Sequence, residues 1–112
     1  MKKKDINKIT EVAESLGWSV RIDKKDCLFS KFSPAGQDFN IEFEAEDLEE
    51  VIEKIKERCV NFDCSEETYL WLDNTGHGAN GAPYDMKDLY EDMEACLEMM
   101  EELSEAMEEI NE

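Results

Sequence analysis

Carboxylates are the side chains in this sequence whose type and spacing most clearly indicate a chemistry. Residues 85–112 contain twelve Asp or Glu and a single Lys. Seven glutamates recur at steps of three or four residues, which places them along one side of a helix. These seven are Glu91, Glu94, Glu98, Glu101, Glu105, Glu108 and Glu112. Neighbours along such a stripe lie roughly 5–6 Å apart along the helix axis, on a scale comparable with the phosphates of a DNA strand.

This stripe is unfavourable for the helix that carries it. Like charges four residues apart destabilise a helix by about 0.2–0.5 kcal/mol per pair, and carboxylates near its C-terminus oppose the helix macrodipole. Lys87 is the only cation among them. Selection for stability alone would place more lysines there. Two explanations remain: a solvated face that favours solubility, or a functional acidic surface.

A second row of carboxylates is expected on a strand. Asp38, Asn40, Glu42 and Glu44 alternate with large apolar residues, so these four polar side chains share one face of the strand. If this row lies beside the helix stripe, the protein has an extended anionic plane. The alternative is an ordinary polar face of a sheet.

The remaining motifs give no support for catalysis or metal binding. The glycines of residues 76–83 match the string Gly-x-Gly-x-x-Gly. No βαβ unit surrounds them, so we expect a turn with unusual backbone angles. His77 and the four cysteines match no zinc spacing, and the calcium-loop signature is absent. We therefore expect no enzyme activity, no metal and no cofactor.

The overall charge restricts the kind of partner. The 112 residues include 30 acidic and 12 basic side chains, a net charge of −18. Residues 1–36 carry a net +3 and residues 37–112 a net −21. Direct binding to nucleic acid is disfavoured because it needs a basic surface. If the rows of carboxylates are a functional surface, the expected partner is a basic nucleic-acid-binding protein. No apolar run approaches 18 residues, and no membrane span is expected.

The N-terminus and the cysteines indicate a cytoplasmic protein. Met1 and three lysines resemble the start of a signal peptide, but the next residues form no apolar segment. Cys27, Cys59, Cys64 and Cys96 include no Cys-x-x-Cys pair. We therefore expect small core thiols in a reducing compartment rather than disulfides.

Hydrophobic periodicity places the first half of the chain on four elements. Apolar residues of 6–16 recur on one helix face, which Gly17 closes. Alternation predicts strands at 18–23 and 39–44, with a less regular strand at 27–32. Short turns join the strands, which favours an antiparallel meander with one covered face.

Two helices are expected next. Asp47 opens the first, and Glu50 three residues later resembles the second half of a capping box. Its buried stripe runs to Cys59. A shorter helix is predicted from Ser65 to Leu72, although its apolar run is also compatible with a strand.

The last predicted helix carries an unbroken apolar heptad pattern. From Met86 to Ile110 the apolar steps alternate between three and four residues. Tyr90 and Leu97 widen the stripe in the first half, which we expect to pack on the sheet. The end beyond Met100 is expected to project or to pair with another helix. The methionines most often indicate core in such a pattern, and a homodimer seam through this C-terminal helix is the alternative.

Two segments resemble a family of small acidic proteins of bacterial phages and mobile elements, which is functionally uncharacterised. They are Phe-Ser-Pro-Ala-Gly-Gln-Asp-Phe at 32–39, and Leu-Trp-Leu-Asp at 70–73 continuing through Gly-His-Gly-Ala-Asn-Gly-Ala-Pro at 76–83. The resemblance covers roughly residues 27–100 and implies no catalytic residue. In charge and size the chain is also similar to DNA-mimic inhibitors of host defence, including anti-restriction and anti-CRISPR proteins.

The sequence thus predicts one α+β domain over residues 1–112. An N-terminal helix precedes a three-stranded antiparallel sheet, and two or three helices then pack on one sheet face, the last of them long and acidic. We expect a non-catalytic DNA-mimic inhibitor that occupies the basic nucleic-acid groove of a host defence protein, of the nuclease or CRISPR-effector type. The alternative is an acidic protein–protein interaction module, or a homodimer, unrelated to nucleic acid.

Overall fold

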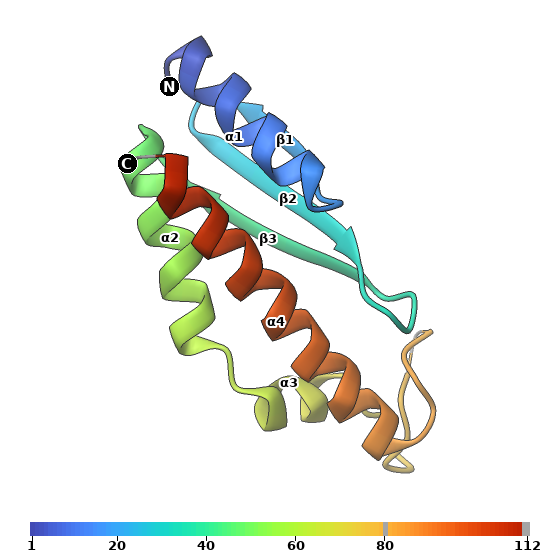
Figure 1. Ribbon diagram of the computed structural model, residues 1–112. Helices are drawn as coiled ribbons and strands as arrows, with labels where there is room; N and C mark the ends of the chain where they lie inside the picture. The colour runs from blue at the N-terminus through green and yellow to red at the C-terminus, as the bar shows by residue number, and fades with distance from the viewer. Residues whose placement is uncertain (80, 111–112) are drawn as a thin grey trace.

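One helix, three strands and three further helices follow one another along the chain (Figure 1). The computed structural model describes residues 1–79 and 81–110. The elements are α1 (Lys3–Ser15), β1 (Ser19–Asp23), β2 (Asp26–Phe32), β3 (Asp38–Glu44), α2 (Leu48–Asn61), α3 (Cys64–Leu70) and α4 (Met86–Ile110). This order confirms the predicted α+β fold with its long C-terminal helix.

The sheet is an antiparallel meander in the order β1-β2-β3. Val20 pairs with Phe29, and Phe29 pairs with Ile41, so these side chains point to one face. Phe29 and Ile41 are fully buried in the core, whereas the alternate positions of β3 are exposed. The helices therefore cover one face of the sheet and leave the other open, as predicted.

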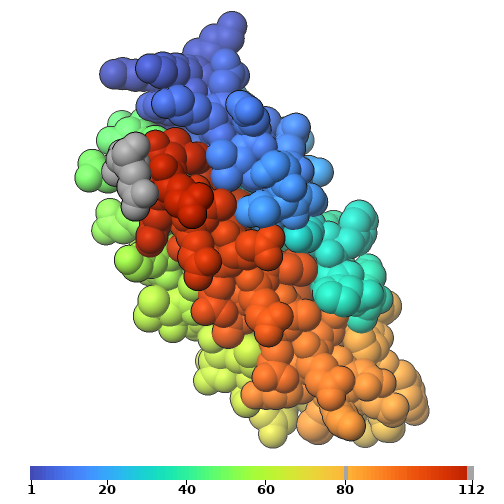
Figure 2. Space-filling view, viewed as in Figure 1, coloured from blue at the N-terminus to red at the C-terminus, as the bar shows by residue number. Residues whose placement is uncertain are grey.

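One core cluster joins the covered sheet face to three helices. α1 contributes Ile9, α2 contributes Val51 and Ile55, and α4 contributes Leu103 and Met107. The apolar stripes predicted for the first two helices are the buried faces of α1 and α2. The outer face of α4 remains open and runs along the visible side of the molecule, between α1 and α2 (Figure 2).

The C-terminal half of α4, rather than its first half, packs on the sheet. Met100 and Leu103 belong to the core cluster with Phe29 and Ile41, whereas Met93 is buried outside that cluster. The first half of α4 lies mainly beside α3 (Figure 1). Of the two residues that widen the stripe there, Leu97 packs against the core cluster and Tyr90 is exposed, so the prediction that this half packs on the sheet was wrong for most of its length. The reason is length: the 25 residues of α4 span about 37 Å, and the seven residues of β3 only about 23 Å.

The methionine stripe of α4 is part of the core. Met93, Met100 and Met107 are at most 3% exposed. Beyond Met100, α4 pairs with α1 and α2 of the same chain, which is the second of the two alternatives predicted for this end. These three methionines therefore leave no exposed surface for a homodimer seam, whereas Met86 at the start of the stripe is 44% exposed.

Local signals fix the ends of the shorter helices. The Asp47 side chain accepts a hydrogen bond from the backbone N–H of Glu50 at 2.9 Å, which confirms the predicted start of α2. α3 confirms the helix rather than the strand, but it ends at Leu70, before the predicted end. Leu72 instead forms an antiparallel bridge with Gly78, which closes the following loop.

The described part of the molecule is elongated, with extents of 48 × 23 × 21 Å. α2 and α4 run alongside each other in opposite directions along much of this length (Figure 1). Among the described residues, no helix combines the length and the apolar character needed to cross a membrane.

Candidate functional site

Most of the predicted glutamate stripe is open to solvent on α4. The exposed members are Glu91, Glu94, Glu98, Glu101 and Glu105. Glu108 is half-buried, and Glu112 lies outside the described residues. The face of α4 seen in Figure 2 is therefore strongly acidic over most of its length.

Helical geometry separates an outer set of glutamates from a lateral one. At about 100° per residue, five exposed glutamates fall within a sector of roughly 60° that lies opposite the buried Met100 and Met107. We call these five the outer stripe: Glu91, Glu98, Glu102, Glu105 and Glu109. Glu102 and Glu109 are absent from the predicted set, although each follows one of its members by four residues.

The lateral glutamates face α2 and α3. They are Glu94, Glu101 and Glu108. Glu108 Oε1 lies 3.3 Å from Lys56 Nζ on α2. Burial raises the pKa of the Cys59 thiol on α2, and the negative charge of Glu101 raises it further. These contacts make the lateral set part of the α2–α4 contact as well as of the surface.

The outer stripe has no ion pair to neutralise it within the described residues. The two ion pairs found there join Lys56 to Glu108 and Lys25 to Glu44. Exposed pairs of this kind contribute only about 0–1 kcal/mol. Solvent and counterions, rather than protein cations, therefore screen the negative potential of the outer stripe.

The predicted acidic row of β3 lies on another face. Asp38, Glu42 and Glu44 are exposed, and the side chains between them turn toward the helices. This row therefore points away from the helix layer, whereas the outer stripe points away from the sheet. The two rows lie on opposite faces of the molecule, so they do not form the single anionic plane considered from the sequence.

One carboxylate of α4 is buried and ties the helix to the sheet. Asp92 is 5% exposed. It accepts hydrogen bonds from Ser33 Oγ at 2.6 Å, from the backbone N–H of Ala35 at 3.0 Å, and from Gln37 Nε2. All three donors belong to the turn between β2 and β3. The signal for this role in the sequence is the spacing of three residues from the buried Leu89, which places Asp92 on the inner side of the helix.

The glycine-rich loop is a hydrogen-bonded turn, as predicted. Asp73 Oδ1 accepts bonds from the Thr75 hydroxyl at 2.6 Å and from the backbone N–H groups of Thr75 and His77. These hydrogen bonds lower the pKa of Asp73, and the bond from the Thr75 hydroxyl has the largest effect. The His77 ring stacks on Tyr84 with centroids 4.1 Å apart. A Cβ on Gly78 would lie 1.8 Å from a backbone carbonyl oxygen, so this position requires glycine.

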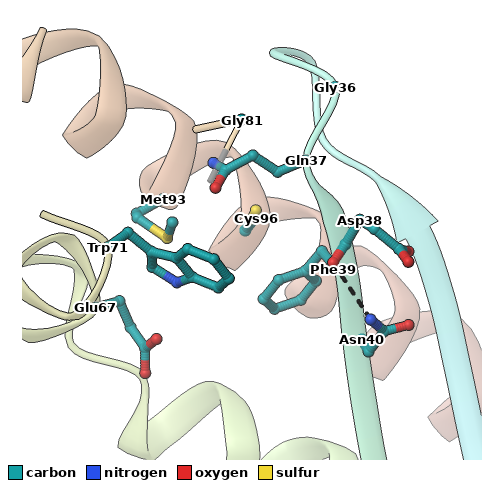
Figure 3. A pocket seen from close by; sticks show the side chains of 10 residues that line it. All are labelled: Gly36, Gln37, Asp38, Phe39, Asn40, Glu67, Trp71, Gly81, Met93 and Cys96. Carbon is teal, nitrogen blue, oxygen red and sulfur yellow. Dashed lines mark hydrogen bonds between the residues drawn. The ribbon is translucent and has the colours of Figure 1, made fainter. Parts of the chain in front are cut away.

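A cavity of about 450 Å³ lies between β3, α3 and α4 (Figure 3). Trp71 and Glu67 form the wall on the α3 side, Phe39 forms the wall on β3, and Met93 and Cys96 lie at the back. Burial raises the pKa of the Cys96 thiol to about 12, so the reactive thiolate is scarce at neutral pH. No local spacing in the sequence indicates that these residues meet, because three separate elements supply them.

Large apolar side chains are exposed where α3 ends and α4 begins. They are Tyr69, Leu70, Tyr84, Met86 and Tyr90. Three of them, Tyr69, Met86 and Tyr90, line a hollow of about 470 Å³ that also borders Glu91 and Glu94. An exposed apolar patch with a polar rim is typical of an interaction surface, and this patch adjoins one end of the outer stripe.

A scan against protein-family models, a search of curated proteins and a search of solved structures found no match to this chain. Function is therefore inferred from the geometry and charge of the chain itself.

Proposed function

We propose that this protein is a non-catalytic binding protein that presents the outer stripe of α4 to the basic groove of a nucleic-acid-binding protein. The observation that carries the proposal is a line of five exposed glutamates on one rigid helix, without an ion pair among the described residues. The helix holds the backbone positions of these charges at fixed spacing, so binding has to order their side chains but not the backbone.

The mechanism is electrostatic competition. A groove that binds phosphates is lined with Lys and Arg, which carboxylates can neutralise in the same place. Complementary charge speeds association, and salt weakens this attraction because it screens the charges. The protein therefore acts as a DNA-mimic inhibitor, and its target is a nuclease or an RNA-guided effector of host defence. The four cysteines, free in the structure, support a reducing cytoplasm as its location.

A second candidate is an acidic interaction module unrelated to nucleic acid. The exposed apolar patch at the start of α4 favours it, because apolar and aromatic side chains dominate binding energy at many interfaces. Such a module would bind through Tyr69, Tyr84 and Tyr90, not through the buried methionines. Its binding would depend weakly on salt.

The test compares three immobilised proteins in a lysate of the native host, eluted with a NaCl gradient. They are the wild type, a stripe variant and a control variant with the same change of net charge. The stripe variant is Glu98→Gln, Glu102→Gln, Glu105→Gln and Glu109→Gln. The control variant is Glu46→Gln, Glu49→Gln, Glu53→Gln and Glu57→Gln, four exposed positions outside α4.

The wild type and the control variant are expected to retain one basic nucleic-acid-binding protein, released at moderate salt. The stripe variant is expected to lose it. Equal retention by the stripe variant, or capture of non-basic proteins alone, would contradict the proposal and favour the interaction module. Because Gln has a helix propensity close to that of Glu, circular dichroism should show the same helix content in all three.

A further inference from the structure

The cavity between β3, α3 and α4 has the shape and lining of a site for a flat organic cation. Trp71 faces into it from the end of α3, and Phe39 lines the opposite wall (Figure 3). Phe39 is itself held edge-on by Trp18 at 6.3 Å and by Phe62 at 6.0 Å between centroids. Trp71 remains 39% exposed. One aromatic wall is thus fixed in advance, and the other is free to cover a ligand.

The charge around the cavity is negative and unmatched. Its lining includes Glu67 but no Lys or Arg among the described residues. Asp38 also borders the cavity, but its carboxylate points to the far side of β3 (Figure 3). Within the described part of the chain, the carboxylate of Glu67 accepts no hydrogen bond and forms no ion pair. Burial raises the pKa of Glu67, with the charge of Glu66 adding to the effect. A half-buried carboxylate beside an aromatic ring is stabilised by any cation that enters.

Arg58 is a cation whose charge acts on Glu67, and its guanidinium is engaged elsewhere. Its guanidinium donates to the backbone carbonyl of Glu42 at 2.9 Å. Its charge lowers the pKa of Glu67 less than burial and Glu66 raise it. Arg58 lines a smaller neighbouring hollow that shares Phe39 and Glu67 with the cavity, so it leaves the main cavity open.

We propose that this cavity receives an arginine side chain of the basic partner protein, stacked on Trp71 and paired with Glu67. A guanidinium is flat, so it stacks on an aromatic face, and its donors form a fork that matches a carboxylate. A lysine ammonium offers a point charge without a face to stack. The cavity opens beside the Asp38 end of β3, so it lies near the second acidic row rather than on the outer stripe. The source of the arginine rests on the proposed function, whereas the chemistry of the cavity does not.

The test uses the full chain and a small probe, N-acetyl-arginine amide, followed by NMR. The reporter is the indole N–H signal of Trp71, assigned through Trp71→Phe. N-acetyl-citrulline amide has nearly the same shape without charge, and N-acetyl-lysine amide has the charge without the flat fork. We expect the arginine probe to shift the Trp71 signal in a saturable way, with the lysine probe several-fold weaker and the citrulline probe weaker still.

Two variants and one matched control locate the binding. Glu67→Gln should lower the affinity for the arginine probe about tenfold, and Trp71→Ala should lower it about five- to tenfold. Glu66→Gln makes the same charge change on the same helix at an exposed position outside the cavity, and it should change binding by less than about twofold. If Trp71→Ala fails to fold, Glu67→Gln against Glu66→Gln decides the question alone.

Equal weakening by Glu66→Gln and Glu67→Gln would show that arginine responds only to net charge, and equal binding of the citrulline probe would show that charge is irrelevant. Either result overturns the cavity proposal. The stripe variant separates it from the proposed function, because that variant should lose the partner while keeping the arginine probe. If Glu67→Gln loses the probe but the lysate yields no basic partner, the cavity is a cation site. The proposal that its arginine comes from a basic partner protein is then overturned.

Discussion

Asp92 shows at the scale of a single residue that the acidity of α4 serves more than one purpose. Its carboxylate accepts three hydrogen bonds from the turn between β2 and β3 while it is 5% exposed. The glutamates of the outer stripe make no such contacts among the described residues. A count of charges in the sequence treats all twelve carboxylates of residues 85–112 alike, whereas the structure gives this one a structural role.

Asp92→Asn should lower the free energy of unfolding by about 1–3 kcal/mol. The N–H groups of the substituted amide would face groups that now donate to the carboxylate, so at least one of these buried hydrogen bonds would be lost. Asp88→Asn is the control, since Asp88 is exposed on the same helix. Urea unfolding followed by circular dichroism measures both, and equal midpoints for the two variants would contradict the role given to Asp92.

At the scale of elements, α4 is both the main core helix and the main acidic surface. Its inner side supplies Met100, Leu103 and Met107 to the cluster that joins the sheet to α1 and α2. Its outer side carries the outer stripe. The core contacts therefore offset the like-charge repulsion along the stripe, and the helix forms despite an unfavourable surface.

Met100→Ala should destabilise the protein by about 2–5 kcal/mol, because it leaves a cavity in the core. Met86→Ala should lower the free energy of unfolding by less than about 1 kcal/mol, since Met86 is 44% exposed at the start of the same stripe. Thermal unfolding of the two variants measures the difference. Similar melting temperatures, together with a loss of self-association in Met100→Ala, would instead support a dimer seam.

Local pattern predicted the elements well but not the contacts between distant segments. The alternation of β3 and the cap of Asp47 act within a few residues, so the sequence shows them directly. The cavity depends on Phe39, Trp71 and Cys96 meeting from three elements, which no local spacing records. Which half of α4 packs on the sheet is likewise set by where the sheet ends, and no local spacing shows this. The outer stripe was recognised in part, because helical spacing is local.

At the scale of the whole molecule, the charge is unevenly distributed. Residues 1–36, which form α1, β1 and β2, carry a net +3, and residues 37–112 carry a net −21. The body is elongated, at 48 × 23 × 21 Å over the described residues, with two similar short axes. A basic groove would therefore be attracted to the α2–α4 side and not to the N-terminal helix, which gives the bound protein a preferred orientation.

Added salt should stabilise this protein. Self-repulsion among the carboxylates weakens as the Debye length falls from about 30 Å at 0.01 M to about 3 Å at 1 M ionic strength. Each 1 kcal/mol recovered raises Tm by about 4–8 °C in a domain near this size. Calorimetry of the wild type and of the four-glutamine stripe variant measures the effect, which should be smaller in the variant. A Tm that falls with NaCl would show that ion pairs outweigh repulsion.

The most direct test of the central claim is competition for the captured partner. A fluorescent nucleic acid is bound to that partner, and its anisotropy is followed as this protein is added at several NaCl concentrations. Binding to the nucleic-acid groove predicts full displacement, a competition constant that weakens steeply with salt, and loss of displacement in the stripe variant but not in the control variant. A ternary complex, in which the nucleic acid stays bound while this protein saturates its partner, would contradict the claim.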